Sequence, residues 1–407
     1  MGATEVLAEP VKLRCGVVLP NRLGKAALSE QLASREGLPT VELLRLYRAW
    51  ADGGAGLLIT GNIMVDPTAL GEPRNVAIPA APDPEPFRAW ARTVGVAGTP
   101  LWVQLNHPGR QTPRFLSKQP VAPSAVPLDV GVGGFFSPPR ELTGAQIEAL
   151  VERYAISARV LVEAGFTGVQ LHGAHGYLIS QFLSPLTNRR TDAWGGDAAR
   201  RRRFLLEIVR AVRAEIGDAV PLSVKLNSAD FQRGGFTEEE SLDVVRELDN
   251  AGIDLVEVSG GTYEQAAMMG LAKNSTVRRE AYFLEYARKV RRISEVTLMV
   301  TGGFRTAEGM AEAVTSGALD VVGFGRPMTL RPDLPARLLA GEAVEAQRPA
   351  PSTGWQPADS WLQLQWYCQQ MHLLAAGKRP QPSRSAARAL IVGGIKDPLN
   401  AFRRVRA

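Results

Sequence analysis

The sequence predicts an α/β protein folded as a single (β/α)8 TIM barrel, with a long excursion after the third strand and a C-terminal extension. Short, nearly continuous apolar runs alternate with longer helical patterns through most of the 407 residues, and such runs are typical of parallel strands buried on both faces. Almost every run ends in polar residues or glycine. No Gly-x-Gly-x-x-Gly turn follows an early strand, which argues against an open, doubly wound sheet.

Eight segments are expected to be the barrel strands. In chain order they are Gly24–Leu28, Gly56–Thr60, Leu101–Leu105, Gly168–His172, Leu222–Leu226, Leu255–Val258, Leu298–Thr301 and Val321–Phe324. The first of them is the least apolar. A strand followed by a helix, repeated eight times, is the chain order of a TIM barrel.

Helical patterns occupy the intervals between the strands. Glu148–Ala164 and Arg203–Ile216 carry apolar residues at helical spacing. Thr237, followed by three glutamates, predicts the capped N-terminus of a further helix. Asn250–Gly252 predicts the end of that helix.

Two stretches fall outside the repeat. Pro108–Arg140 is rich in Pro, Gly and Ser, and an excursion at this point lies over the strand C-termini, where barrels place their sites. The chain after the eighth helix concentrates aromatic residues, namely Trp355, Trp361, Trp366 and Tyr367. We therefore expect a barrel over residues 1–345 and an extension over 346–407 that packs on the barrel or on a partner subunit of a homo-oligomer.

Composition narrows the function classes. The net charge is +6, but the only dense basic run is Arg200–Arg203, which we expect to be a solvated helix face rather than a nucleic-acid patch. Cys15 and Cys368 are the only cysteines, which excludes a cysteine-held iron–sulfur cluster and disfavours a disulfide framework. The start of the chain does not resemble a signal peptide, and no apolar run is as long as a membrane span. We expect a cytoplasmic protein with a small-molecule partner and no nucleic-acid or membrane binding.

The ends of the last two strands predict a phosphate site. Gly302 and Gly303 follow the seventh strand, and Gly325 and Arg326 follow the eighth. Glycine lets backbone N–H groups approach an anion closely, and barrel enzymes usually hold phosphate at this place. Ordinary turn glycines are the alternative.

His172, His175 and Tyr177 follow the fourth strand and are the candidate catalytic residues. Two histidines at a strand exit suit a pair of donors aimed at a carbonyl oxygen, with a phenol as the acid. A core histidine or a zinc site is the alternative, but no third ligand stands nearby and no metal is expected.

Lys225 ends an apolar strand, either as a barrel-wall ion pair or as the partner of a negative cofactor ring. Gln104 offers a donor and an acceptor to the edge of a heterocycle.

Several long motifs resemble those of the old yellow enzyme family of NADH:flavin oxidoreductases. They are Pro20–Arg22, Gln104–Arg110, His172–Pro185, Asn188–Asp192, Trp194–Gly196 and Gly323–Pro327. Trp194 stands where the family often has tyrosine. The resemblance covers roughly residues 10–345.

The resemblance implies non-covalent FMN at the barrel mouth and NADH or NADPH as the reductant. It places Ala27 and Ser29 beside the flavin, with the Ser29 hydroxyl near the C4 carbonyl and N5, and it places Asn62 near the ring. It assigns the pyrimidine end to Gln104 and to Lys225, which stands for the commoner arginine. The phosphate-binding residues that it implies are Gly302, Gly303, Gly325 and Arg326.

The implied reaction is a ping-pong reduction of activated C=C bonds in enones and nitroalkenes. Reduced nicotinamide reduces FMN and leaves, and flavin N5 then delivers hydride to the β carbon. His172 and His175 polarise the acceptor oxygen, and Tyr177 protonates the α carbon. The alternative is a phosphate-binding barrel lyase or isomerase that uses Lys225 as a Schiff base. A non-catalytic barrel is a third interpretation, which the two histidines and the tyrosine argue against.

Overall fold

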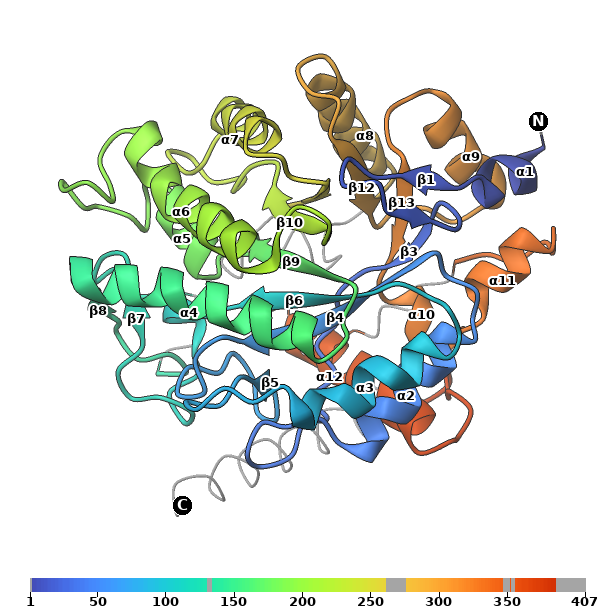
Figure 1. The fold of residues 1–407 in the computed structure, drawn as a ribbon, viewed down its shortest axis with the longest axis horizontal. Coiled ribbons are helices and arrows are strands. Elements are labelled where there is room, and N and C mark those ends of the chain that lie inside the picture. Colours follow the sequence, from blue (N-terminus) through green and yellow to red (C-terminus); the bar gives the residue numbers. More distant parts are fainter. Residues whose placement is uncertain (1, 130–133, 261–275, 347–351, 353–355, 386–407) are drawn as a thin grey trace.

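The computed structural model describes residues 2–129, 134–260, 276–346, 352 and 356–385, which form a (β/α)8 barrel (Figure 1). Eight parallel strands follow one another around the barrel, and the first pairs with the second to close it. They are β3 (Leu23–Lys25), β4 (Leu57–Met64), β6 (Leu101–Asn106), β9 (Gly168–Gly173), β10 (Leu222–Asn227), β11 (Leu255–Ser259), β12 (Thr297–Thr301) and β13 (Val321–Phe324). The predicted barrel is confirmed, although its first strand is shorter than expected. A two-residue strand, β5 (Val76–Ala77), pairs in parallel with the end of β4.

Helices follow the strands and form the outer layer (Figure 1). They are α1 (Ala3–Ala8), α2 (Val41–Ala51), α3 (Glu85–Gly95), α4 (Gly144–Glu163), α5 (Leu178–Leu183), α6 (Ala198–Ile216), α7 (Glu238–Asn250), α8 (Thr276–Arg291), α9 (Ala307–Thr315), α10 (Pro327–Leu330), α11 (Leu334–Leu339) and α12 (Gln356–Ala375). The two predicted helical stretches correspond to α4 and α6. Thr237 caps α7, and Glu240 completes a reciprocal capping box.

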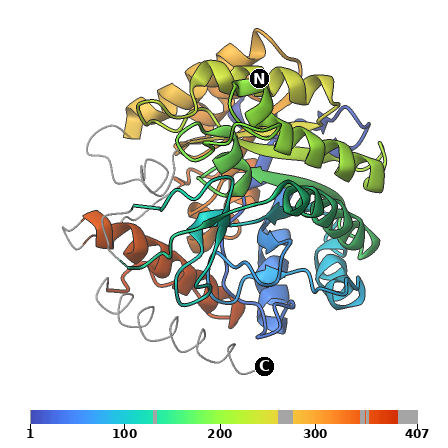
Figure 2. The ribbon, with the colours of Figure 1, turned by 90° about the vertical axis from the view of Figure 1, so that its left-hand side faces the viewer.

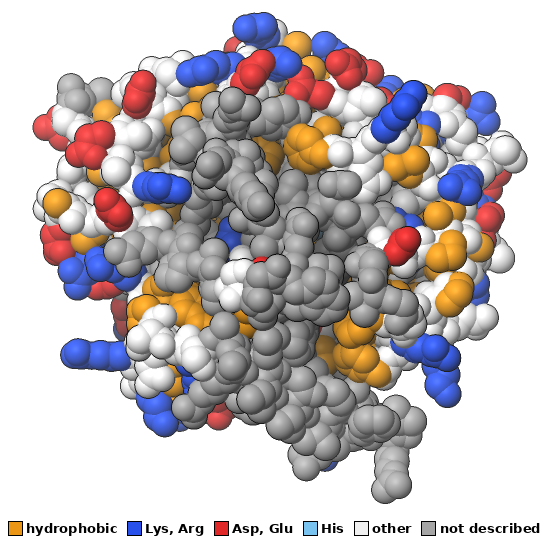
Figure 3. All heavy atoms as spheres, turned by 180° about the vertical axis from the view of Figure 1, so that it is seen from behind, with side chains coloured by type: hydrophobic (Ala, Val, Ile, Leu, Met, Phe, Trp, Pro, Cys, Tyr) orange, Lys and Arg blue, Asp and Glu red, His pale blue; other side chains and the backbone are white. Residues whose placement is uncertain are grey.

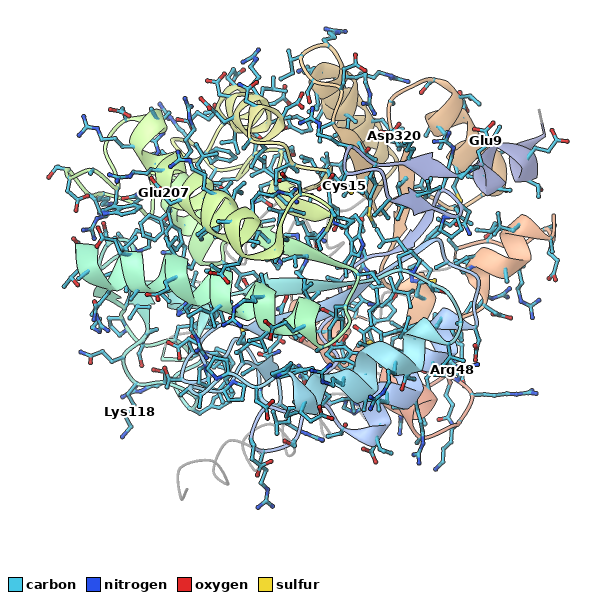
Figure 4. All side chains as sticks on the ribbon, viewed as in Figure 1. Glu9, Cys15, Arg48, Lys118, Glu207 and Asp320 are labelled. Atoms are coloured by element: carbon cyan, nitrogen blue, oxygen red, sulfur yellow. The ribbon has the colours of Figure 1, made fainter. Side chains whose placement is uncertain are left out.

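A hairpin of β1 (Val11–Lys12) and β2 (Val18–Leu19) closes the N-terminal end of the barrel. Its apolar side chains join those at the strand starts in one buried cluster: Val11, Leu13, Leu19, Ala26, Leu57, Ile59, Trp102, Leu255, Met299 and Val321. Arg22 fastens the N-terminal segment to the barrel, because its guanidinium donates to Glu9 Oε2 at 2.9 Å and to the Asp320 carbonyl at 3.1 Å. Glu9 and Asp320, both labelled in Figure 4, lie on the same side of the molecule. The barrel therefore has an apolar floor.

Arg190 fastens the excursion after β6 to the segment after β9. The excursion contains a 3-10 turn at Gly109–Gln111 and two short paired strands, β7 (Val121–Ala122) and β8 (Arg140–Glu141). The buried Arg190 guanidinium donates to the carbonyls of Pro123 at 3.0 Å and Leu142 at 2.6 Å, and to Glu141 Oε1 at 3.1 Å and Asp192 Oδ2 at 2.5 Å. One side chain thus joins the two short strands of the excursion to the chain that follows β9.

We expect Arg190→Met to lower the free energy of unfolding by about 2–4 kcal/mol, because two backbone carbonyls lose a charged donor. The carboxylates of Glu141 and Asp192 are half exposed, so their share of the loss is small. Urea unfolding followed by circular dichroism measures the change. Arg189→Met is the matched control, since the Arg189 side chain is exposed. An equal loss in the two variants would contradict this anchoring.

Helix α12 packs beside α2 and α10 (Figures 1 and 2). Cys368 Sγ lies 3.3 Å from the Ser29 carbonyl oxygen, and His372 Nε2 lies 2.9 Å from the Glu30 carbonyl oxygen. These contacts bring the C-terminal part of the chain to the segment after β3. Trp366 and Tyr367 are buried. Trp355 and the side chain of Trp361 lie outside the described residues, and packing on a partner subunit stays a prediction, as does the boundary at residue 346.

The basic run at the start of α6 is only partly a solvated face. Arg201 is buried at 7% exposure, and its guanidinium donates to the carbonyls of Leu183 at 3.0 Å and Gly196 at 2.5 Å and to the Glu240 carboxylate. The interpretation was wrong for Arg201, because α6 packs against α5 and α7 at this point. On the opposite side of the molecule, seen in Figure 3, basic and acidic side chains are interspersed around the residues drawn in grey. Among the described helices, none has the length and apolar character to cross a membrane.

Candidate active site

The inward-facing side chains become polar toward the C-terminal ends of the strands. Beyond the apolar floor come Gln104, Gln170, Lys225, Glu257 and Thr301, from β6, β9, β10, β11 and β12. Two residues further along four of these strands are Asn106, His172, Asn227 and Ser259. Alternation along a strand points residues two apart to the same face. The mouth of the barrel is therefore lined with amides, imidazoles and hydroxyls.

His172, His175 and Tyr177 lie together at this mouth. The ring centroid of His172 is 5.0 Å from that of His175 and 4.8 Å from that of Tyr177, both edge-on. His172 is on β9, His175 is in the following turn with φ of 62°, and Tyr177 is the N-cap residue of α5. The change from strand to helix within five residues brings the three rings to one place.

Both imidazoles are held neutral. Burial, and then the positive charge of Lys225, lowers the pKa of each ring well below the usual 6.5. His172 Nδ1 accepts the Ala174 N–H at 3.3 Å, so the ring proton sits on Nε2 and is available to a ligand. His175 Nε2 lies 2.6 Å from the Ser259 hydroxyl, which fixes the orientation of that ring.

Gln104 and Lys225 belong to one buried network. Gln104 Nε2 donates to Gln170 Oε1 at 2.7 Å, and Gln170 Nε2 donates to Glu257 Oε2 at 3.0 Å. Lys225 Nζ donates to Glu257 Oε1 at 2.9 Å, and the Glu257 side chain is fully buried. The barrel-wall ion pair considered for Lys225 therefore exists. An ammonium held by a carboxylate is a poor nucleophile, which disfavours the Schiff-base alternative.

Ser29 and Ala27 follow β3 at the same end of the barrel. The Ser29 hydroxyl donates to the buried carboxylate of Glu72. Asn75 holds that glutamate from both sides, because its Nδ2 lies 3.1 Å from Glu72 Oε2 and its Oδ1 accepts the Glu72 N–H at 2.7 Å. Burial raises the pKa of the Glu72 carboxyl. Ala27 is partly buried against the apolar floor.

Asn62 lies on β4 in register with Gln104 on β6. The register between the two strands shifts immediately before Asn62, which marks a bulge. Gly61 has no room for a side chain, since a Cβ there would lie 2.2 Å from the Leu28 carbonyl oxygen. The half-buried Asn62 amide is thus placed beside Gln104 by a kink that needs glycine.

The glycine pairs lie at adjacent strand ends. Gly302 and Gly303 have φ of 99° and 94°, a region that favours glycine. A Cβ on Gly302 would meet nothing within 4 Å, so open space borders this backbone. Gly325 and Arg326 lead directly into α10. The Arg326 guanidinium donates to Gln363 Oε1 at 3.3 Å.

The mouth fits a heteroaromatic ligand with its own donors and acceptors. Within the described residues, Gln104 Oε1 and both amide atoms of Asn106 are buried without a hydrogen-bond partner. Such buried unpaired groups cost about 1–3 kcal/mol each, so they indicate a ligand that completes them. The pyrimidine edge of a flavin carries an N–H between two carbonyls. No three His, Cys, Asp or Glu side chains of the described chain gather closely enough to hold a metal ion.

Several polar residues near the site received no individual role from the sequence. Among them are Glu72, Gln170, Glu257 and Ser259. The sequence could have indicated Gln170 and Glu257 as site residues, because each interrupts an apolar strand at an inward position. Glu72 carries no such signal, since it comes from the loop after β4, 43 residues from its partner Ser29.

A TIM barrel with glycines at its seventh and eighth strand ends and unpaired amides in its mouth fits an FMN-dependent oxidoreductase. The family model described as the NADH:flavin oxidoreductase / NADH oxidase family matches residues 6–345. The chain belongs to this family, the old yellow enzyme family, and it is an oxidoreductase that uses FMN with NADH or NADPH.

Two curated relatives and one solved structure illustrate the similarity. The chain is 39% identical over 393 residues to an NADH-dependent flavin oxidoreductase of Hypocrea jecorina, which covers 90% of this chain and 95% of that protein. It is 38% identical over 361 residues to one of Talaromyces variabilis, at 83% and 87% coverage. The old yellow enzyme homologue of Zymomonas mobilis superposes with a TM-score of 0.70 at 27% identity, over 83% of this chain and 93% of that one.

Proposed function

We propose that this enzyme reduces activated C=C bonds of small molecules, with enones as the main class and nitroalkenes as the second. The observation that supports this most is the pair of neutral imidazoles of the buried His172 and the partly buried His175 beside the phenol of Tyr177. Fixed donors in a buried site stabilise charge that develops on a carbonyl or nitro oxygen. FMN, when bound, supplies the hydride.

The three rings divide the remaining work. His172 donates from Nε2 to the acceptor oxygen, because its Nδ1 is occupied by the Ala174 N–H. His175 is the second donor, and Ser259 sets the orientation of its ring. Tyr177 gives its hydroxyl proton to the α carbon as the enolate charge collapses.

The residues at the mouth of the barrel lead us to assign the following contacts to FMN. The unpaired carbonyl of Gln104 and the ammonium of Lys225 hold the pyrimidine end. The backbones of Gly302, Gly303, Gly325 and Arg326 hold the phosphate. The side chains or backbone of Ala27, Ser29 and Asn62 border the ring.

The first test is the identity of the chromophore and of its oxidant. We expect mass spectrometry of the heat-released chromophore to find FMN, held without a covalent bond. Stopped-flow reduction with NADH and with NADPH, followed by reoxidation with enones, nitroalkenes and oxygen, should show the fastest reoxidation with an activated alkene. FAD in place of FMN would overturn the phosphate assignment. Reoxidation by oxygen alone would overturn the proposed reaction.

A further inference from the structure

Glu257 is the last residue of a hydrogen-bond chain that runs from Gln104 through Gln170, and the FMN assignment gives this glutamate no role. Its side chain is fully buried inside the barrel. Oε1 accepts from Lys225 Nζ at 2.9 Å and from Thr301 Oγ1 at 2.6 Å. Oε2 accepts from Gln170 Nε2 at 3.0 Å. The carboxylate thus faces three donors and offers none, which is what an ionised carboxylate requires.

This charge fixes the direction of two amides in turn. Since Glu257 can only accept, Gln170 must turn its –NH2 toward Glu257, and its carbonyl then faces Gln104. Gln104 must in turn direct its –NH2 toward that carbonyl, at 2.7 Å. The carbonyl of Gln104 is left over, and it is one of the buried atoms that have no hydrogen-bond partner within the described residues. Reversing either amide would set donor against donor or acceptor against acceptor.

We propose that Glu257 is a positioning residue that acts through Gln170 to present the Gln104 carbonyl as an acceptor for the imide N–H of the flavin ring, while it holds Lys225 in place. The proposal rests on the assignment of Gln104 and Lys225 to the pyrimidine end of FMN. It adds the reason why Gln104 accepts rather than donates there. It also means that the positive charge at that end is partly compensated by a buried anion.

The test uses the holoenzyme reconstituted with FMN labelled with 15N at N3. A hydrogen bond from N3–H to Gln104 moves the N3 and H3 resonances downfield and protects H3 from exchange. Gln170→Met removes the relay but keeps the Glu257 contacts with Lys225 and Thr301. We expect it to lose the downfield shift and to raise the FMN Kd roughly three- to tenfold, the effect of one hydrogen bond. Ser223→Ala is the matched control, because the Ser223 hydroxyl also contacts Gln170 Nε2, at 3.3 Å, but can serve as donor or acceptor. That variant should keep the parent spectrum.

Glu257→Gln adds a second readout, the flavin midpoint potential, which would not change if Glu257 had a purely structural role. We expect the same loss of the N3–H signal together with a rise in the flavin midpoint potential, because Lys225 is left without its anion and favours anionic reduced flavin. Gln170→Met should leave the potential nearly unchanged, since it alters no charge. The double variant with Gln170→Met and Glu257→Gln should lose no more of the N3–H signal than Gln170→Met alone, as expected for two residues of the same hydrogen-bond chain.

Gln104→Met separates this inference from the assignment on which it rests. A parent-like N3–H signal in Gln104→Met would overturn the FMN assignment itself. Loss of the signal in Gln104→Met but not in Gln170→Met would overturn the relay alone. Gln170→Met decides this even if Glu257→Gln does not fold, because it leaves the buried ion pair intact.

Discussion

Replacing either His172 or His175 with Ala should slow enone reduction about 10²–10³-fold, the usual cost of removing one donor to a developing oxyanion. The His172 ring is buried, the His175 ring is partly buried and both are uncharged, so each contributes a fixed N–H rather than a mobile charge. FMN reduction by nicotinamide needs no oxyanion, so its rate should change much less. Stopped-flow reoxidation by cyclohexenone measures the loss, and the charge-transfer band of a bound phenolate reports the donors directly.

The backbone of His175 provides the control. Its φ of 62° lies in the left-handed region, where asparagine is tolerated far better than alanine. His175→Asn keeps an N–H donor without the strain, so it should recover much of the activity lost in His175→Ala. If His175→Asn is as slow as His175→Ala while both bind FMN, the donor role fails.

The sign of the pKa shift gives a second check on the histidine pair. Both rings have a pKa well below 6.5, so they are neutral above that value and remain neutral as the pH rises. Histidine ionisation should therefore not change the rate of the enone half-reaction between about pH 6 and pH 8. An ordinary histidine would titrate in that range. A rate that follows a single ionisation near 6.5 would show that a ring titrates at its ordinary pKa, and this would contradict the lowered pKa values.

The barrel could be predicted because its signals are local and repeat. Each buried strand carries a continuous apolar run, and each run ends in a polar residue or glycine at the same edge, as at His172 and Gly302. The capping box at Thr237 marked a helix start correctly, since its partner Glu240 lies only three residues away. Features with short sequence separation can be read from the chain itself.

The connections among the site residues could not be predicted in the same way. The Ser29–Glu72 bond joins two loops, and the line from Gln104 through Gln170 to Glu257 joins three strands. Pairing of this kind depends on barrel closure and register, which the apolar pattern does not contain. The same limit explains Arg201, whose burial follows from packing of α6 against α5 and α7 and not from its own sequence neighbours.

Tyr177→Phe should separate the two half-reactions of the enzyme. The phenol ring packs edge-on to His172 at 4.8 Å, and Phe keeps that ring and its packing. Nicotinamide reduction of FMN uses no proton from this hydroxyl, so it should remain near normal. Enone reduction should slow by about 10²–10⁴, the contribution of a well-placed general acid. Tyr154→Phe is the matched control, since Tyr154 is equally buried but lies on α4 in the outer core.

A nitroalkene should respond differently from an enone in the same variant. The nitronate formed by hydride addition is stable enough to leave without protonation, whereas the enolate of an enone is not. Tyr177→Phe should therefore still reduce a nitroalkene at a near-parent rate and release nitronate, which absorbs in the ultraviolet and can be followed as it forms. Paired stopped-flow traces with the two acceptors measure the contrast. Equal slowing of FMN reduction and of both reoxidation traces would mean that the Tyr177 hydroxyl supports the mouth of the barrel and transfers no proton.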